Sequence, residues 1–265
     1  MTGALLGQRL YAHCNQPVLR RVVGINHCFC LMLLTQRVLL WLPLLGAATA
    51  CQTDVSSQLP LTGTLYQSDF SKGPDNWKAD FADYHLDNGD MQLASNWTSL
   101  PKPLDTGRKS LSLSGINRSD DLFMYMTRKL TGLRPNTDYT LTFSVELASQ
   151  YAANSIGIGG SPGGSVYLKA GATSFEPKRQ LVDGFYQLNI DKGNQLEGGR
   201  DAQTLGTIGI TDDAAAYTLI TRTNEGKPQT VRSSPAGELW LIVGTDSGYE
   251  GLTTLYYSRI TVTAR

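Results

Sequence analysis

A strict alternation of apolar and polar residues marks the segment from Tyr139 to Leu147. Apolar side chains occupy every second position, and threonine, serine or glutamate occupies the positions between them. Successive side chains of a strand point to opposite faces, so this period of two predicts a strand with one buried and one solvent-facing side. The same period recurs over 110–114 and 166–170. These segments predict a protein built from antiparallel sheets.

Three further segments predict strands. Residues 238–243 (ELWLIV) are apolar at successive positions after Glu238, as expected of a central strand that is covered on both faces, so Trp240 is predicted to be structural. Residues 123–130 are strand-like, and residues 253–263 close the chain with another period of two. Predicted strands therefore recur from residue 110 to residue 263.

Helical patterns are few and short. Trp77, Phe81 and Tyr84 have helical spacing, and residues 212–218 are long enough for one turn. Glycine-rich or polar runs predict loops over 157–164, 191–203 and 223–237. The chain is thus expected to contain little helix.

The segment Leu133-Arg-Pro135-Asn-Thr137-Asp-Tyr139 leads into the strict alternation. Its pattern Leu-x-Pro-x-Thr-x-Tyr resembles the strand-to-strand corner of fibronectin type III domains and jelly-roll carbohydrate-binding modules. In those families the tyrosine hydroxyl bonds back to the upstream backbone and locks the crossing between two sheets. About 100 residues is normal for the immunoglobulin-like version, so this longer chain fits a jelly roll better. We therefore expect residues 62–265 to form a single all-β domain, a jelly-roll-like two-sheet antiparallel β-sandwich.

The first fifty residues have a different character. They contain no Asp or Glu, and Arg37 is followed by an uncharged apolar stretch over 38–50 (VLLWLPLLGAATA). A basic flank, an apolar stretch and small residues before a cleavage site are typical of a secretory signal peptide. A helix over 38–50 would span roughly 20 Å, short of the roughly 30 Å hydrocarbon core of a membrane. Residues 1–50 are therefore predicted to be a signal peptide, and Met32 would give a start of more usual length.

Ala48-Thr49-Ala50-Cys51 resembles the lipobox of bacterial lipoproteins, although that family prefers leucine where Ala48 stands. The resemblance implies that the Cys51 sulfur receives a diacylglycerol and that its amine is acylated too. More than one acyl chain is needed for stable attachment to a membrane. The alternative is ordinary cleavage after Ala50, which leaves a free thiol. Residues 51–61 would be the lipidated cysteine and a polar tether, and Gln52 implies sorting to the outer membrane if the organism has one.

Charge and cysteine content restrict the possible partners and sites. Residues 51–265 keep all 23 acidic residues but only 19 of the 23 basic ones, so their net charge is about −4. They contain no basic cluster, which argues against a nucleic-acid partner. Cys51 is their only cysteine, so they hold neither an intramolecular disulfide nor a cysteine-based zinc site.

Two strings suggest catalysis, but their context does not support it. Gly159-Gly-Ser161-Pro-Gly163 matches the G-x-S-x-G motif of α/β-hydrolases, yet a predicted strand follows it and His85 precedes it, contrary to that family's order. A glycine loop is the better interpretation, with His85 as a surface or packing residue. Asp105-Thr-Gly107 and Asp246-Ser-Gly248 resemble the paired signatures of pepsin-like proteases. The chain is much shorter than a two-lobed protease.

Several residues are candidates for binding. The segment 244–251 is predicted to be a loop between two strands, and its carboxylates Asp246 and Glu250 are candidates for a structural Ca²⁺, which prefers oxygen ligands. Trp77, Trp97 and Tyr249 are candidates for stacking on a sugar ring, because each stands in a loop-like or marginal strand context.

The leading hypothesis is therefore an exported, lipid-anchored protein of the cell envelope. It would bind a glycan or another envelope component without catalysis. One alternative is a secreted carbohydrate-active enzyme, since jelly rolls also host lyases and hydrolases. A second alternative is a structural subunit of an envelope assembly, which a broad exposed apolar patch would favour.

Overall fold

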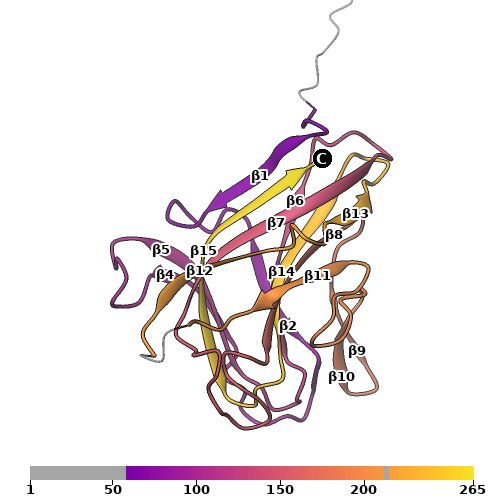
Figure 1. Cartoon of the computed structure of the whole chain (residues 1–265). Helices are drawn as coiled ribbons and strands as arrows, with labels where there is room; N and C mark the ends of the chain where they lie inside the picture. The colour runs from indigo at the N-terminus through magenta and orange to yellow at the C-terminus, as the bar shows by residue number, and fades with distance from the viewer. Residues whose placement is uncertain (1–57, 212–214) are drawn as a thin grey trace, which may run out of the picture. The chain divides into compact units, whose positions relative to one another are not determined.

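The computed structural model describes residues 58–211 and 215–265 (Figure 1). The predicted signal peptide, Cys51 and most of the predicted tether lie outside the described residues. All the described residues belong to one compact unit. None of them lies in a helix, so none forms an apolar helix long enough to cross a membrane.

Fifteen strands are distributed along the described residues. The strands are β1 (Gly63–Asp69), β2 (Lys78–Ala82), β3 (Tyr84–His85), β4 (Ala94–Ser99), β5 (Lys109–Ile116), β6 (Phe123–Leu130), β7 (Asp138–Ser149), β8 (Val166–Thr173), β9 (Arg179–Val182), β10 (Phe185–Leu188), β11 (Ala202–Thr207), β12 (Thr218–Thr223), β13 (Gln229–Arg232), β14 (Leu239–Ser247) and β15 (Leu252–Ala264).

These strands pair in three antiparallel sheets. A seven-stranded sheet has the order β12-β7-β15-β5-β4, with β1 also paired to β15 and β13 to β7. A five-stranded sheet has the order β11-β8-β14-β6-β2, and a small sheet has the order β3-β10-β9. The first strand thus lies beside the last one, and their ends meet where Gly63 pairs with Ala264 (Figure 1).

The seven-stranded and five-stranded sheets enclose the main hydrophobic core. From Tyr139 to Leu147 of β7 every second side chain is buried, as the alternation predicts. From the opposite sheet, Leu168 of β8 and Leu241 of β14 belong to the same core. The fold is therefore an all-β, jelly-roll-like sandwich of two antiparallel sheets, which confirms the predicted fold class.

The small sheet and the loop before β11 form a partial third layer on the outer face of the five-stranded sheet. A second apolar cluster lies there, in which Phe123, Tyr125 and Ile242 are buried and Leu188 and Ile190 pack against them. Residues on the outer face of β8 and β14 are thereby removed from solvent. This layer buries Asp246, one of the predicted Ca²⁺ ligands.

The predicted corner is present. The Tyr139 hydroxyl accepts a hydrogen bond of 2.9 Å from the backbone N–H of Arg134, five residues upstream. Tyr139 is buried at the start of β7, and Leu133 is buried beside it. The corner fixes the direction in which the chain leaves β6 for β7, so the prediction of a tyrosine that bonds back to the backbone is confirmed.

Three local predictions were wrong. The segment after Asp75, whose apolar residues have helical spacing, does not form a helix, because residues 78–82 form β2 and pair with β6. The predicted loop over 223–237 contains β13, which pairs with β7. The predicted loop over 244–251 begins only after Ser247, since β14 extends to that residue. Long-range strand pairing overrode a weak local pattern in each case.

Candidate functional site

Trp77 does not present its ring to solvent. Its side chain is 6% exposed and lies in the core, edge-on to Phe70 with ring centroids 6.4 Å apart. The indole Nε1–H donates a hydrogen bond of 3.0 Å to the Tyr66 hydroxyl. A sugar ring therefore cannot stack on Trp77, and its prediction as a binding residue was wrong because burial is the usual state of a tryptophan.

Trp97 is the predicted aromatic residue that stays accessible. It lies on the edge strand β4, and its side chain is 44% exposed. Its Nε1–H donates a hydrogen bond of 2.7 Å to the carbonyl of Phe70, and the Lys109 ammonium lies 5.7 Å from the ring centroid. The indole is therefore held in a fixed orientation at the edge of the sandwich with part of its apolar face open.

Tyr249 and Trp240 are both half-buried. Tyr249 is half-buried in the loop after β14, and it packs so closely on Gly157 that a Cβ atom there would lie 2.6 Å from the tyrosine ring. Trp240 lies in β14 as predicted, but on its outer face, where Lys129 stands 5.9 Å from the ring centroid. Tyr249 thus supports the glycine loop.

The geometry does not fit the predicted calcium site. Asp246 lies within β14, and its side chain is fully buried. Its Oδ2 atom is 2.6 Å from the Lys192 ammonium and 3.3 Å from the Lys169 ammonium. Glu250 is exposed in the loop beyond. Asp246 is thus already neutralised by two cations, and among the described residues no three or more histidine, cysteine or carboxylate side chains group as metal ligands.

The catalytic-looking strings have structural roles. Ser161 lies in a loop, where its Oγ accepts a hydrogen bond of 2.9 Å from the Gly164 N–H, which confirms the glycine-loop interpretation. Asp105 is exposed in a turn and bonds to the Gly107 N–H, whereas Asp246 is buried in β14. His85 is exposed in β3 with its ring edge-on to Phe185. These residues do not meet in a common site.

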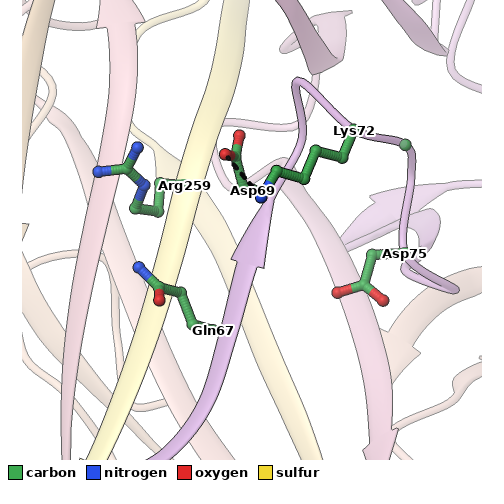
Figure 2. A pocket seen from close by; sticks show the side chains of 6 residues that line it. Gln67, Asp69, Lys72, Asp75 and Arg259 are labelled. Carbon is green, nitrogen blue, oxygen red and sulfur yellow. Dashed lines mark ion pairs between the residues drawn. The ribbon is translucent and has the colours of Figure 1, made fainter.

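A hollow that the sequence analysis did not predict lies beside the end of β1. It has a volume of about 640 Å³, within the roughly 300–1,000 Å³ that small-molecule sites occupy. The residues that line it are Gln67, Asp69, Lys72, Gly73, Asp75 and Arg259. Figure 2 shows Gln67 and Arg259 on neighbouring strands, with Lys72 and Asp75 on the loop that follows β1. We call this the first hollow.

A smaller hollow of about 220 Å³ adjoins the first one and shares Gln67 and Arg259 with it. We call it the second hollow. Its other lining residues come from β7, β12 and β15 and are Ser144, Glu146, Thr221 and Thr261. The two hollows together extend across the outer face of the seven-stranded sheet.

Strand register explains why these side chains meet. Asp69 of β1 pairs with Arg259 of β15, Arg259 pairs with Glu146 of β7, and Glu146 pairs with Thr221 of β12. Residues opposite one another on neighbouring strands share a face. The pairing therefore produces a cross-strand row in which a carboxylate, a guanidinium, a second carboxylate and a hydroxyl follow one another.

The carboxylates of the first hollow are held in place by neighbours. Asp69 accepts a hydrogen bond of 2.7 Å from the Ser71 hydroxyl, and this contact holds the pKa of Asp69 below its usual value. The Lys72 ammonium lies 3.9 Å from Asp69, as the dashed line in Figure 2 marks. Asp69 is therefore an ionised acceptor at neutral pH.

Asp75 is fixed by a brace that reaches into the core. The Tyr66 hydroxyl donates to Asp75 Oδ2, and Arg128 Nη1 lies 3.3 Å from Oδ1. Arg128 also stacks on the Tyr66 ring at 4.6 Å. Burial, together with the bond to Asp75, raises the pKa of Tyr66 to about 12, so this hydroxyl remains a donor at neutral pH. The backbone of Asp75 and Asn76 has φ of 48° and 58°, which is unusual for residues other than glycine.

Trp97 lies close to the first hollow without lining it. Its indole nitrogen bonds to the carbonyl of Phe70, the residue that follows Asp69 in the chain. Of the three aromatic candidates, Trp97 is thus the one that is both exposed and hydrogen-bonded to the segment that lines the hollow. No local pattern indicated the hollow itself, because residues 67–75 and 259 are brought together only by the pairing of β1 with β15.

Comparisons with known proteins assign no family to the chain. No family model matches it, and no curated protein matches it. Among solved structures it is similar to the enzymatically active domain of tailspike protein 4 from bacteriophage CBA120, at 9% identity and a TM-score of 0.33. That match covers 72% of this chain and 19% of the phage domain, so the chain spans about a fifth of that relative.

Two smaller proteins match over most of their own length. A putative sugar-binding protein from Bacteroides thetaiotaomicron has 7% identity and a TM-score of 0.39, over 74% of this chain and 92% of that one. A carbohydrate-binding module described as recognising mannan has 13% identity and a TM-score of 0.36, over 76% and 97%. At these values neither match defines a ligand, and the fold described above rests on the strand pairing.

Proposed function

We propose that the chain is a lipid-anchored protein of the cell envelope whose sandwich binds a neutral glycan without cleaving it. The observation that carries this proposal is the first hollow, which is lined almost entirely by side chains that form hydrogen bonds. Its two carboxylates are balanced by Lys72 and Arg259. A ligand of matching character would carry hydroxyls that both donate and accept, and no net charge.

The surroundings of the hollow support the same ligand class. The second hollow continues the surface with Ser144, Thr221 and Thr261, whose hydroxyls donate and accept in the same way. Trp97 offers an exposed apolar ring that is hydrogen-bonded to the carbonyl of Phe70, the residue after Asp69, and such rings pack on the C–H face of a pyranose. A sugar chain could therefore be held by polar groups in the hollows and by an aromatic ring at the edge.

Hydrolysis is the second candidate, because Asp69 and Asp75 line one hollow and glycosidases use a pair of carboxyl groups. One member of such a pair must be a protonated acid with a raised pKa. The pKa of Asp69 is lowered instead, and Asp75 is engaged by Tyr66 and Arg128. This arrangement suits Asp69 and Asp75 to accept hydrogen bonds from a ligand, and it does not provide the acid and base that hydrolysis needs.

Binding is tested with protein purified after expression of the full chain and a panel of neutral polysaccharides that includes β-glucan, mannan, xylan and galactan. We expect retention on at least one polymer. Arg259→Met should weaken that retention about tenfold or more, because a charged hydrogen bond contributes about 1.5–3 kcal/mol. Trp97→Ala should weaken it as well. Recovered polymer should keep its original length.

Arg232→Met is the matched control, because Arg232 is an exposed arginine on β13 of the same sheet and lines neither hollow. It should bind like the unmodified protein. Retention on no neutral polymer, or equal losses in Arg259→Met and Arg232→Met, would contradict the proposed site. Release of oligosaccharides would establish the hydrolase instead.

The anchor is tested separately, because it rests on the lipobox resemblance at Cys51. Protein extracted from membranes should have an intact mass greater than that of residues 51–265 by a diacylglycerol and an acyl chain. Cys51→Ser should carry no diacylglycerol in the same measurement, because serine has no thiol to receive it. An unmodified thiol at Cys51 of the membrane-extracted protein would contradict lipidation.

A further inference from the structure

Four charged side chains are buried together between the five-stranded sheet and the layer that covers it. Lys169 of β8 and Asp246 of β14 lie on the outer face of that sheet, and both side chains are 0% exposed. Lys192 comes from the covering loop, and Asp83 lies between β2 and β3. We call these four residues the lysine cluster. Its two ammonium groups and two carboxylates balance in charge.

The Lys169 ammonium is surrounded by oxygen atoms. Its Nζ donates hydrogen bonds to three backbone carbonyls of the covering loop, those of Lys192 at 2.9 Å, Glu197 at 3.0 Å and Asn194. The Asp246 Oδ2 atom lies 3.3 Å away. An ammonium has three donors and no acceptor, so the three carbonyls accept all of its hydrogen bonds and the carboxylate balances its charge.

The rest of the cluster ties the neighbouring segments to this centre. The Lys192 ammonium lies 2.6 Å from Asp246 Oδ2 and 2.9 Å from Asp83 Oδ2. The loop also bonds to itself, since Asp191 accepts hydrogen bonds from the N–H groups of Gly193 and Arg200. Two central strands, the covering loop and the turn at Asp83 therefore converge on one pair of ammonium groups.

We propose that the Lys169 ammonium is the structural cation of this domain and holds the loop of residues 191–201 on the five-stranded sheet. Backbone carbonyls with a carboxylate are the donor set that proteins use for hard metal cations. Here the chain supplies the positive charge itself, as a compact ammonium on a flexible stem. The proposal is independent of glycan binding, because none of the four residues lines the first or second hollow.

The test uses Lys169→Ala and n-propylammonium, with protein purified after expression of the full chain. The variant lacks three carbons and the ammonium beyond Cβ, and n-propylammonium replaces those atoms. Because breaking a buried ion pair leaves an uncompensated charge, we expect the melting temperature of Lys169→Ala to fall on the order of 10 °C. Millimolar n-propylammonium should restore part of the loss, since a ligand that binds only the folded state stabilises it.

Three controls make the result specific. n-Propanol has the same carbon chain without the charge, and it should not restore Lys169→Ala. Lys178→Ala removes an exposed lysine and should melt like the unmodified protein. A chelator should leave the melting temperature of the unmodified protein unchanged. An unaltered melting temperature of Lys169→Ala, equal rescue by n-propanol, or destabilisation by the chelator would overturn the proposal.

A measurement on the unmodified protein applies even if Lys169→Ala does not fold. An amine-acylating reagent should modify the exposed Lys72 and Lys178 of the native protein rapidly and Lys169 only after unfolding. Peptide mass spectrometry locates each modified lysine. Acylation of Lys169 in the native protein at the rate of Lys72 would overturn the proposal, because an enclosed ammonium cannot meet the reagent.

Discussion

Trp77→Ala is expected to lower the free energy of unfolding by about 3–5 kcal/mol, the usual cost of truncating a buried tryptophan to alanine. The ring is buried against Phe70 and Tyr66, at centroid distances of 6.4 Å and 6.3 Å, so its removal leaves a cavity in the main core. It also removes the indole donor of the Tyr66 hydroxyl. Denaturant titration followed by circular dichroism measures the change.

Trp97→Ala is the matched comparison, since it removes the same side chain from an edge strand where nearly half of it is exposed. We expect a cost of about 1 kcal/mol, mainly from the lost hydrogen bond to the Phe70 carbonyl. The two variants should also differ in glycan binding, with Trp97→Ala weakening it at nearly unchanged stability. A Trp77→Ala protein as stable as Trp97→Ala would contradict the burial described for Trp77.

Asp246→Asn is expected to cost about 3–5 kcal/mol, because it leaves the Lys169 and Lys192 ammonium groups without their shared carboxylate. The substitution nearly preserves shape, so the loss reports charge rather than volume. Lys192 would keep Asp83 as a partner, and Lys169 would keep only carbonyls. Equilibrium unfolding in urea measures the difference from the unmodified protein.

Asp138→Asn provides the control for this prediction. Asp138 forms an ion pair of 3.3 Å with Arg232 on the surface of the seven-stranded sheet, where both side chains are exposed. Exposed pairs contribute about 0–1 kcal/mol, so this variant should remain close to the unmodified protein. If both variants lose similarly little free energy of unfolding, the buried carboxylate stabilises the fold no more than a surface one, which would contradict the prediction.

The sequence was a good guide where the local pattern and the tertiary environment agree. The alternation over 139–147 predicted β7 and its buried face, because a period of two has meaning only in a strand that packs on one side. The apolar run before Val243 predicted a central strand, and β14 does lie between β6 and β8. The corner at Tyr139 was predictable because its residues are close in the chain.

The candidate site was not predictable, for a physical reason. Asp69 and Arg259 are 190 positions apart, and only the register of β1 on β15 brings them together. Nothing in the local pattern distinguishes a polar residue that lines a hollow from one that simply faces water. The same limit applies to Asp246, whose neighbours in sequence suggested a metal-binding loop, whereas its partners come from residues 169 and 192.

The helical spacing of Trp77, Phe81 and Tyr84 failed for a related reason. Trp77 and Tyr84 are both buried, but they lie on either side of the short strand β2 rather than on one face of a helix. Three apolar residues at that spacing are compatible with either structure, and pairing with β6 decides between them. Trp77 and Trp97 were likewise predicted to bind sugar on equal grounds, and only the structure shows that Trp77 is buried and Trp97 is exposed.

The pairing of the first strand with the last has a mechanical consequence. Gly63, where the tether would enter, and Asp69, at the first hollow, are the two ends of β1, about 20 Å apart along an extended strand. A bound polymer dragged by flow would pull β1 lengthwise against β15. Antiparallel hydrogen bonds lie perpendicular to the strands, so that force loads the whole ladder in shear instead of opening it one bond at a time.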